Sequence, residues 1–149
     1  MITNNYILCG SKSLVIRGLL HRKVSDIDLL TDLRTSKLQK FVKPWFKIDL
    51  VNIKMFREYD DVPHKGYAVK CMKVEDVLYF KYIFMKRIQK HFKDFDNKHR
   101  KDLINVFHNL GKDKSNDIIN KMLDKHPTHI DTKELYELMQ IGINNQSEI

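Results

Sequence analysis

Three aspartates are the residues of this sequence whose types and spacing most clearly could do chemistry. Asp26 and Asp28 stand two positions apart in SDIDLL, which predicts a strand, and residues i and i+2 of a strand project from one face. Two neighbouring carboxylates repel unless a cation lies between them, and Mg²⁺ (or Mn²⁺) is a hard cation that takes oxygen ligands. Asp49, in the alternating segment FKIDLVNI, would complete a three-carboxylate cluster if its strand pairs beside the first. Such a cluster can hold two metal ions, one at an attacking hydroxyl and one at a triphosphate.

A Gly-Ser pair precedes these aspartates. Gly10 and Ser11 follow an apolar run at 6–9 that predicts a strand entering a tight turn. A Gly-Ser turn that opens a helix exposes backbone N–H groups and a hydroxyl, and both can bind phosphate. Taken singly, Asp-x-Asp pairs are often solvent-facing or turn residues, and a lone Gly-Ser is a weaker signal still. The ordered combination of the two motifs indicates a site.

The elements that would position these residues form a strand-rich first half and a helical second half. Strands are predicted over 6–9, 25–31, 46–53 and 67–72, with a short helix over 13–20. Apolar periodicity predicts further helices over 74–89, 98–110, 115–123 and 132–139, with Gly111 ending the second of these and Ser115 capping the third. We therefore expect an α/β (α+β) fold with a small mixed sheet of three to five strands. Residues 1–73 would form the catalytic core, and residues 74–149 a helical part packed on it in one compact unit.

The order of these motifs resembles the nucleotidyltransferases of the DNA polymerase beta superfamily. Within it, GSKSLVIRGLLHRKVSDIDLL is most similar to AbiEii-type and other minimal enzymes, which carry an Arg-x-Ser-x-Asp-x-Asp-like stretch. Here that stretch is Arg22, Ser25, Asp26 and Asp28, with Arg22 displaced by one residue. The resemblance implies the polymerase-beta-type fold and magnesium-dependent transfer of a nucleoside monophosphate from an NTP to an acceptor hydroxyl. It also implies that Asp26, Asp28 and Asp49 are catalytic metal ligands and that Gly10, Ser11, Arg22 and Ser25 bind the nucleotide.

Lys81 would add a cation to this site. It stands on the apolar stripe of the helix predicted at 74–89, where a lysine either extends its ammonium to solvent or meets an anion. The resemblance implies that Lys81 contacts the triphosphate. Relatives often carry an Arg/Lys-Asp motif on the next helix, and the run HRKD at 99–102 could fill that place. Asp102 could equally form a plain ion pair with Arg100 or a neighbouring lysine.

The net charge of +8 is concentrated in one segment. Residues 81–101 contain eight Lys/Arg and two Asp, interleaved with Phe92 and Phe95. Such a patch suits tRNA or another nucleic acid, and a solvated helix face would look the same. The acceptor stays open between an RNA end, a protein side chain and a small molecule. The alternatives are a catalytically inactive antitoxin of a toxin–antitoxin pair and a basic nucleic-acid-binding module whose aspartates are incidental; the full carboxylate set argues against the first.

The remaining composition narrows the class of protein. Cys9 and Cys71 lie in apolar runs without zinc-ligand spacing, which predicts two reduced core thiols. No apolar stretch approaches the ~20 residues that cross a bilayer, and the start of the chain lacks a signal-peptide pattern. We therefore expect a cytoplasmic protein without a membrane segment, and the sequence indicates no oligomeric state.

Overall fold

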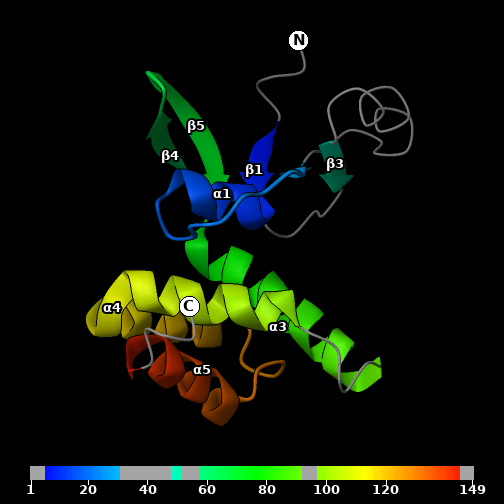
Figure 1. Cartoon of the computed structure of the whole chain (residues 1–149), viewed down its shortest axis with the longest axis vertical. Coiled ribbons are helices and arrows are strands. Elements are labelled where there is room, and N and C mark those ends of the chain that lie inside the picture. The colour runs from blue at the N-terminus through cyan, green and yellow to red at the C-terminus, as the bar shows by residue number, and fades with distance from the viewer. Residues whose placement is uncertain (1–5, 31–47, 52–57, 92–96, 145–149) are drawn as a thin grey trace. The chain divides into compact units, whose positions relative to one another are not determined.

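The structure of the protein is a computed structural model that describes residues 6–30, 48–51, 58–91 and 97–144 (Figure 1). Residues 48–51 are described by their backbone. The chain divides into two compact units, Met1–Lys73 and Val74–Ile149. The described strands all belong to the first unit, and the long helices belong to the second.

The first unit contains a mixed sheet with the strand order β3-β2-β1-β5-β4. The strands are β1 (Ile7–Cys9), β2 (Ile27–Leu30), β3 (Ile48–Val51), β4 (Tyr59–His64) and β5 (Tyr67–Met72). Strand β1 pairs antiparallel with β2 and parallel with β5, while β2 pairs parallel with β3 and β4 pairs antiparallel with β5. The predicted α+β class with a small mixed sheet is confirmed.

Burial explains why β1 and β4 occupy their places in the sheet. All three residues of β1 are buried, as befits a central strand, whereas exposure alternates along β4 at one end of the strand order. Strand β4 contains Pro63, a residue that sheets accept at an edge. Lys65 and Gly66, both with positive φ (50° and 84°), form the two-residue turn from β4 to β5, and Figure 1 shows the resulting hairpin.

Helix α1 (Gly10–Ile16) begins three residues earlier than the sequence predicts and ends four residues earlier. Its first turn is closed by the Ser13 hydroxyl, which donates to the Gly10 carbonyl at 2.7 Å, and Leu14 is fully buried. Gly18 ends it with φ +75°, the Gly18 N–H donating to the Val15 carbonyl at 3.0 Å. A glycine in the left-handed region is a common helix terminator, so the predicted continuation to residue 20 was wrong.

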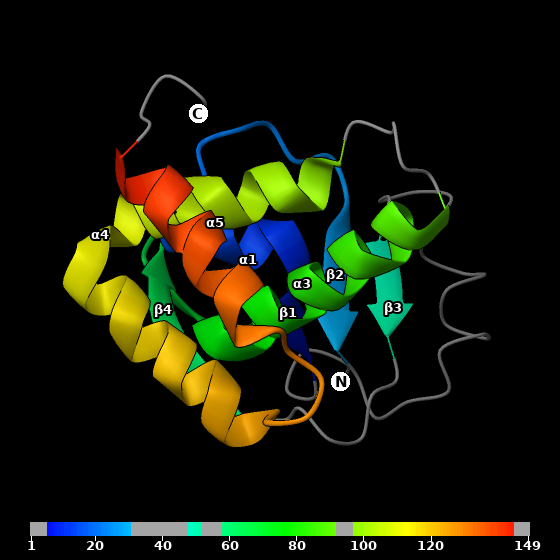
Figure 2. The same cartoon turned by 90° about the horizontal axis from the view of Figure 1, so that it is seen from below.

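The second unit consists, in its described part, of α3 (Val74–His91), α4 (Lys98–Lys125) and α5 (Thr132–Asn144). Asn97 caps the start of α4, and its side-chain oxygen accepts from the Arg100 N–H at 3.2 Å. Gly111 interrupts it with φ 80° and ψ 174°, and Figure 2 shows the two arms running in different directions. The predicted break at Gly111 is therefore confirmed. Ser115, predicted as a cap, instead donates to the Phe107 carbonyl at 3.1 Å across the bend.

The three helices share one apolar core. Its fully buried members come from every helix: Leu78, Tyr82, Met85, Leu103, Phe107, Ile119, Met122 and Leu135. Helix α5 lies close to α4 at Gly142, where an added Cβ would stand 2.5 Å from the Ile104 carbonyl oxygen. Only glycine fits that contact, so residue size sets how closely these two helices pack.

Candidate functional site

The turn from β1 into α1 is the place in the first unit where two of the predicted motifs meet. Cys9 pairs with Asp28 in the antiparallel register of β1 and β2, which brings the Asp28 side chain to the turn. Gly10 has φ +65°, and a Cβ there would overlap Oδ2 of Asp28 and lie 3.1 Å from its Cγ. The carboxylate therefore occupies the space that any other residue type at position 10 would fill. The Gly-Ser turn and the Asp-x-Asp segment, 16 residues apart in sequence, meet at this point.

The other two predicted ligand residues have backbones near that of Asp28. Asp26 directly precedes β2 and is exposed, while Asp28 is half-buried. Asp49 is the register partner of Asp28 in the parallel pairing of β2 with β3, so their backbones lie side by side. Within the described part of the chain, no three His, Cys, Asp or Glu side chains gather closely enough to hold a metal ion, and the Asp49 side chain lies outside that part.

Two of the predicted nucleotide-binding residues contact each other. Nη2 of Arg22 donates to Oγ of Ser11 at 3.1 Å, and Nη1 donates to the Lys23 carbonyl at 3.3 Å. Arg22 is exposed, so this guanidinium lies in water beside the hydroxyl that follows Gly10. Ser25 is exposed in the segment that leads to Asp26. The hydrogen bond from the Arg22 guanidinium to the Ser11 hydroxyl thus joins the segment before β2 to the start of α1.

The thiol beside this turn is a structural group. Cys9 is buried and donates a hydrogen bond to the Asp28 carbonyl at 3.4 Å. Burial, together with the negative charge of Asp28, raises the pKa of Cys9 to about 12, although a backbone hydrogen bond at Leu30 opposes the rise. A thiol with that pKa stays protonated and is a poor nucleophile at neutral pH. The prediction that Cys9 and Cys71 are free core thiols is confirmed.

An ion-pair cluster at the end of α1 is a feature that the sequence did not indicate. Nη2 of Arg17 donates to Oδ2 of Asp60 and to the Met72 carbonyl, both at 2.9 Å, and Nζ of Lys73 lies 2.5 Å from Oδ1 of Asp60. Burial raises the pKa of Asp60, but hydrogen bonds and positive charge from Lys73 and Arg17 outweigh it, so the pKa is lowered. The cluster ties α1 to β4 and β5 and thereby fixes the helix that carries Ser11.

Lys81 lies in the second unit in a buried ion pair. Its Nζ donates to Oδ2 of Asp102 at 2.8 Å, and the two side chains are only 6% and 3% exposed. Asp102 therefore pairs with Lys81 across α3 and α4 in the core, so the predicted surface ion pair with Arg100 or a neighbouring lysine was wrong. The prediction that Lys81 contacts a triphosphate is not tested by this contact.

A cluster of histidine, lysine and aspartate side chains around Tyr79 in the helical unit is another feature that the sequence did not indicate. The His126 ring stacks on Tyr79 with centroids 3.5 Å apart, and the Tyr79 hydroxyl lies 2.9 Å from Nδ1 of His129. Nζ of Lys125 lies 3.3 Å from Oδ2 of Asp76, whose Oδ1 is 3.9 Å from Nε2 of His126. Burial and the positive charges of Lys125 and His129 lower the pKa of His126. These contacts hold the start of α3 against the end of α4.

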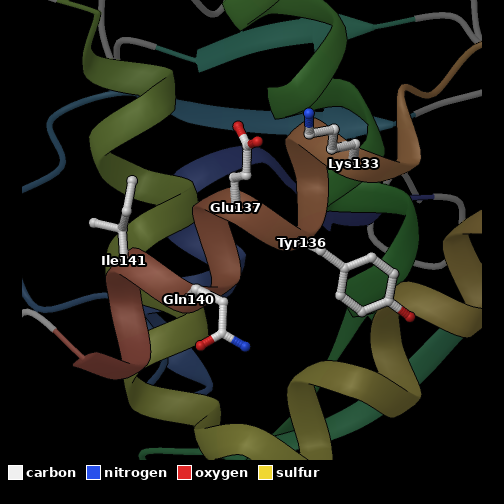
Figure 3. A pocket seen from close by; sticks show the side chains of 5 residues that line it. All are labelled: Lys133, Tyr136, Glu137, Gln140 and Ile141. Atoms are coloured by element: carbon white, nitrogen blue, oxygen red, sulfur yellow. The ribbon is translucent and has the colours of Figure 1, made fainter.

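The outer face of α5 has a shallow hollow, and Figure 3 shows that all its labelled side chains come from that helix. Lys133, Tyr136, Glu137, Gln140 and Ile141 line it. None of the predicted site residues is among them. The hollow therefore lends no support to the predicted site.

Comparison with known proteins gives little beyond these contacts. No known protein family matches the sequence, and no curated protein matches it. The chain is similar to the crystal structure of an antigenic nucleotidyltransferase-like protein from Paracoccidioides brasiliensis, with 14% identity and a TM-score of 0.46 over 91% of this chain and 84% of that chain. At that identity and TM-score the similarity carries no argument about activity. No helix in the described residues has the length and apolar character that crossing a bilayer requires.

Proposed function

We propose that the chain is a magnesium-dependent nucleotidyltransferase, which moves a nucleoside monophosphate from an NTP to an acceptor hydroxyl and releases pyrophosphate. The placement of the Asp28 carboxylate against Gly10 carries the proposal. It brings a metal-ligand type of side chain to the turn whose N–H groups and hydroxyl suit a phosphate. Neither motif would support the proposal alone, because both are common in unrelated proteins.

The donor set fits magnesium. Asp26, Asp28 and Asp49 would hold the ion through carboxylate oxygens, the ligands that Mg²⁺ prefers. The in-register pairing of Asp28 with Asp49 and the position of Asp26 two residues before Asp28 support this assignment. When bound, Mg²⁺ neutralises charge on a triphosphate and makes an acceptor hydroxyl easier to deprotonate. Asp49 would assist that deprotonation.

The remaining residues would bind and orient the nucleotide. Gly10 and Ser11 would hold the triphosphate, and Arg22, which already touches Ser11, would place a guanidinium beside it, with Ser25 near. The α-phosphorus would then face in-line attack by the acceptor oxygen while the pyrophosphate leaves. Phosphoryl transfer gains most from positioning and charge neutralisation, which this arrangement is suited to supply. A contact of Lys81 with the triphosphate stays a prediction.

One experiment tests this activity directly. The protein is incubated with each labelled NTP, Mg²⁺ and either total tRNA or a cell lysate, beside an Asp26→Ala/Asp28→Ala variant. Asp61→Asn is the matched control, because Asp61 is an exposed carboxylate on β4 outside the proposed site. Label transfer that survives in Asp61→Asn and disappears in the double variant supports the enzyme. Absence of transfer to every acceptor, together with absence of Mn²⁺ binding to the unmodified protein, contradicts it.

A further inference from the structure

Phe84 is an aromatic side chain that the helical unit leaves in solvent. It lies on α3 and is 40% exposed. Its partners are polar or aromatic: the Arg87 guanidinium lies over the Phe84 ring at 5.7 Å, the His99 ring lies 5.5 Å away, and the Phe80 ring 6.3 Å away. The exposed ring with a cation beside it offers an aromatic face on which another planar group could stack.

The charge around Phe84 is segregated. Residues 84–101 carry seven Lys/Arg and two Asp, whereas residues 74–149 as a whole carry 13 Lys/Arg and 12 Asp/Glu. The helical unit as a whole is nearly neutral, so its positive charge is concentrated near Phe84 and does not reflect a generally basic unit. Arg87, Lys90, Lys98 and Lys101 are exposed, and Lys86 lies 3.0 Å from the Glu134 carboxylate. Lys81, by contrast, is buried with Asp102 and belongs to the core.

We propose that the surface formed by Phe80, Phe84, Arg87 and His99, called the α3 surface below, binds a single-stranded nucleic acid. A base would stack on the exposed Phe84 ring beside the Arg87 guanidinium, and the flanking lysines would contact the phosphates. Stacking on an aromatic ring and phosphate contacts by cations are the two interactions that bind single strands without sequence preference. The bases of a duplex are already stacked on one another, so a duplex would use the charges alone.

The aromatic stripe favours a single-stranded polynucleotide over an acidic protein segment. Phe80 and Phe84 stand four residues apart on α3, with Arg87 three residues further, so the rings and the guanidinium form one stripe. A stripe of π-faces and a planar cation matches the repeated bases and phosphates of one strand. If the proposed transfer activity holds, this strand is the acceptor, and that link alone rests on the proposed function.

The test measures binding by fluorescence anisotropy with labelled 12-nucleotide single-stranded RNA, the same DNA sequence and its duplex. The protein carries Asp28→Asn and no NTP is present, so the result does not depend on catalysis. Phe84→Leu keeps an apolar side chain without a π-face, and Phe84→Trp restores one. Lys114→Gln, an exposed cation on the second arm of α4, is the control for loss of a single charge.

We expect Phe84→Leu to weaken single-strand binding about tenfold, Phe84→Trp to match or exceed the unmodified protein, and Lys114→Gln to change it less than twofold. Arg87→Gln should weaken binding, and Lys90→Gln, which removes one of the flanking phosphate contacts, should reduce the slope of log Kd against log salt by about 0.7. Equal binding by the Leu and Trp variants, or equal affinity for duplex and single strand, overturns the proposal. So does a protein that captures no single strand at low salt. The RNA and DNA arms tell which sugar the surface accepts.

Discussion

A pair of glycines with the same backbone strain allows the role of the Asp28 carboxylate to be isolated. Gly10 and Gly18 both have positive φ, +65° and +75°. A Cβ at Gly10 would overlap Oδ2 of Asp28, whereas nothing lies within 4 Å of a Cβ at Gly18. Gly10→Ala and Gly18→Ala therefore share the conformational cost, and only the first also displaces a proposed metal ligand.

This difference sets the expected losses of stability and of Mn²⁺ affinity in the two variants. An alanine in the left-handed region costs about 1–2 kcal/mol, and both variants incur that loss of stability. In Gly10→Ala the Asp28 side chain must also turn away from its present rotamer, which adds about 0.5–1.5 kcal/mol. The carboxylate is the mobile end of its side chain and can leave its place, while Cβ of Asp28, which would lie 3.2 Å from the added Cβ, must also give slightly. Loss of one charged ligand should weaken Mn²⁺ binding at least tenfold, or about 1.4 kcal/mol.

The assay combines urea unfolding with Mn²⁺ titration followed by electron paramagnetic resonance. We expect Gly18→Ala to lose stability and to keep both Mn²⁺ affinity and label transfer. Gly10→Ala should lose slightly more stability, and its Mn²⁺ affinity and transfer rate should fall at least tenfold. If both variants bind Mn²⁺ alike, the Asp28 carboxylate at the turn has no part in a metal site and the central argument for the activity fails.

Three further predictions concern the helical unit. Lys81→Met should destabilise the protein by about 3 kcal/mol or more in urea unfolding, because it removes the cation from the buried Lys81–Asp102 ion pair and leaves the carboxylate in the core without that counter-charge. Lys81→Met/Asp102→Leu should recover most of that loss, and a single variant as stable as the parent would refute the pairing. Gly142→Ala should cost about 1–3 kcal/mol, because its Cβ would press on the Ile104 carbonyl, and an unchanged Tm would contradict that packing. The lowered pKa of His126 means that the folded state favours the neutral ring. The contribution of this ring to the free energy of unfolding is therefore complete above pH 6.5 and declines as the pH falls toward the folded-state pKa. In chemical unfolding, the free energy of unfolding of His126→Gln should therefore fall less between pH 6.5 and 5 than that of the unmodified protein. An equal fall in both proteins would contradict this prediction.

The meeting of Gly10 with Asp28 could be anticipated from sequence because it depends on short-range facts. A strand that ends just before Gly10 and a strand that contains Asp28 are joined by a short helix, and consecutive elements usually lie side by side. The register of Cys9 with Asp28 then places the carboxylate at the turn. The helix boundary was less predictable, because Gly18 ends α1 through its backbone conformation and the apolar pattern continues past it.

Strand β4 was not predicted because its residues carry no strand signal. Its sequence, YDDVPH, contains two aspartates and a proline, types that sheets disfavour, and it forms by pairing with the more strand-like β5. One of these aspartates, Asp60, has a structural role in an ion-pair cluster. Asp60 receives both Arg17 and Lys73, and only the three-dimensional pairing of β4 with β5 brings these distant residues together. Long-range ion pairs of this kind have no spacing signature in a single sequence.

The distribution of charge in the first unit bears on what it could bind. Residues 1–73 carry 14 Lys/Arg and seven Asp/Glu, so the acidic residues there are the minority. Three of the seven are Asp26, Asp28 and Asp49, and Asp60 is paired with two cations. If Asp49 joins Asp26 and Asp28 as proposed, the metal ligands would concentrate negative charge inside a positively charged unit. Such a field attracts a polyphosphate at long range while the carboxylates attract a divalent cation at short range, so metal and nucleotide would reinforce each other's binding. A purely acidic metal site would repel the triphosphate that this reaction needs.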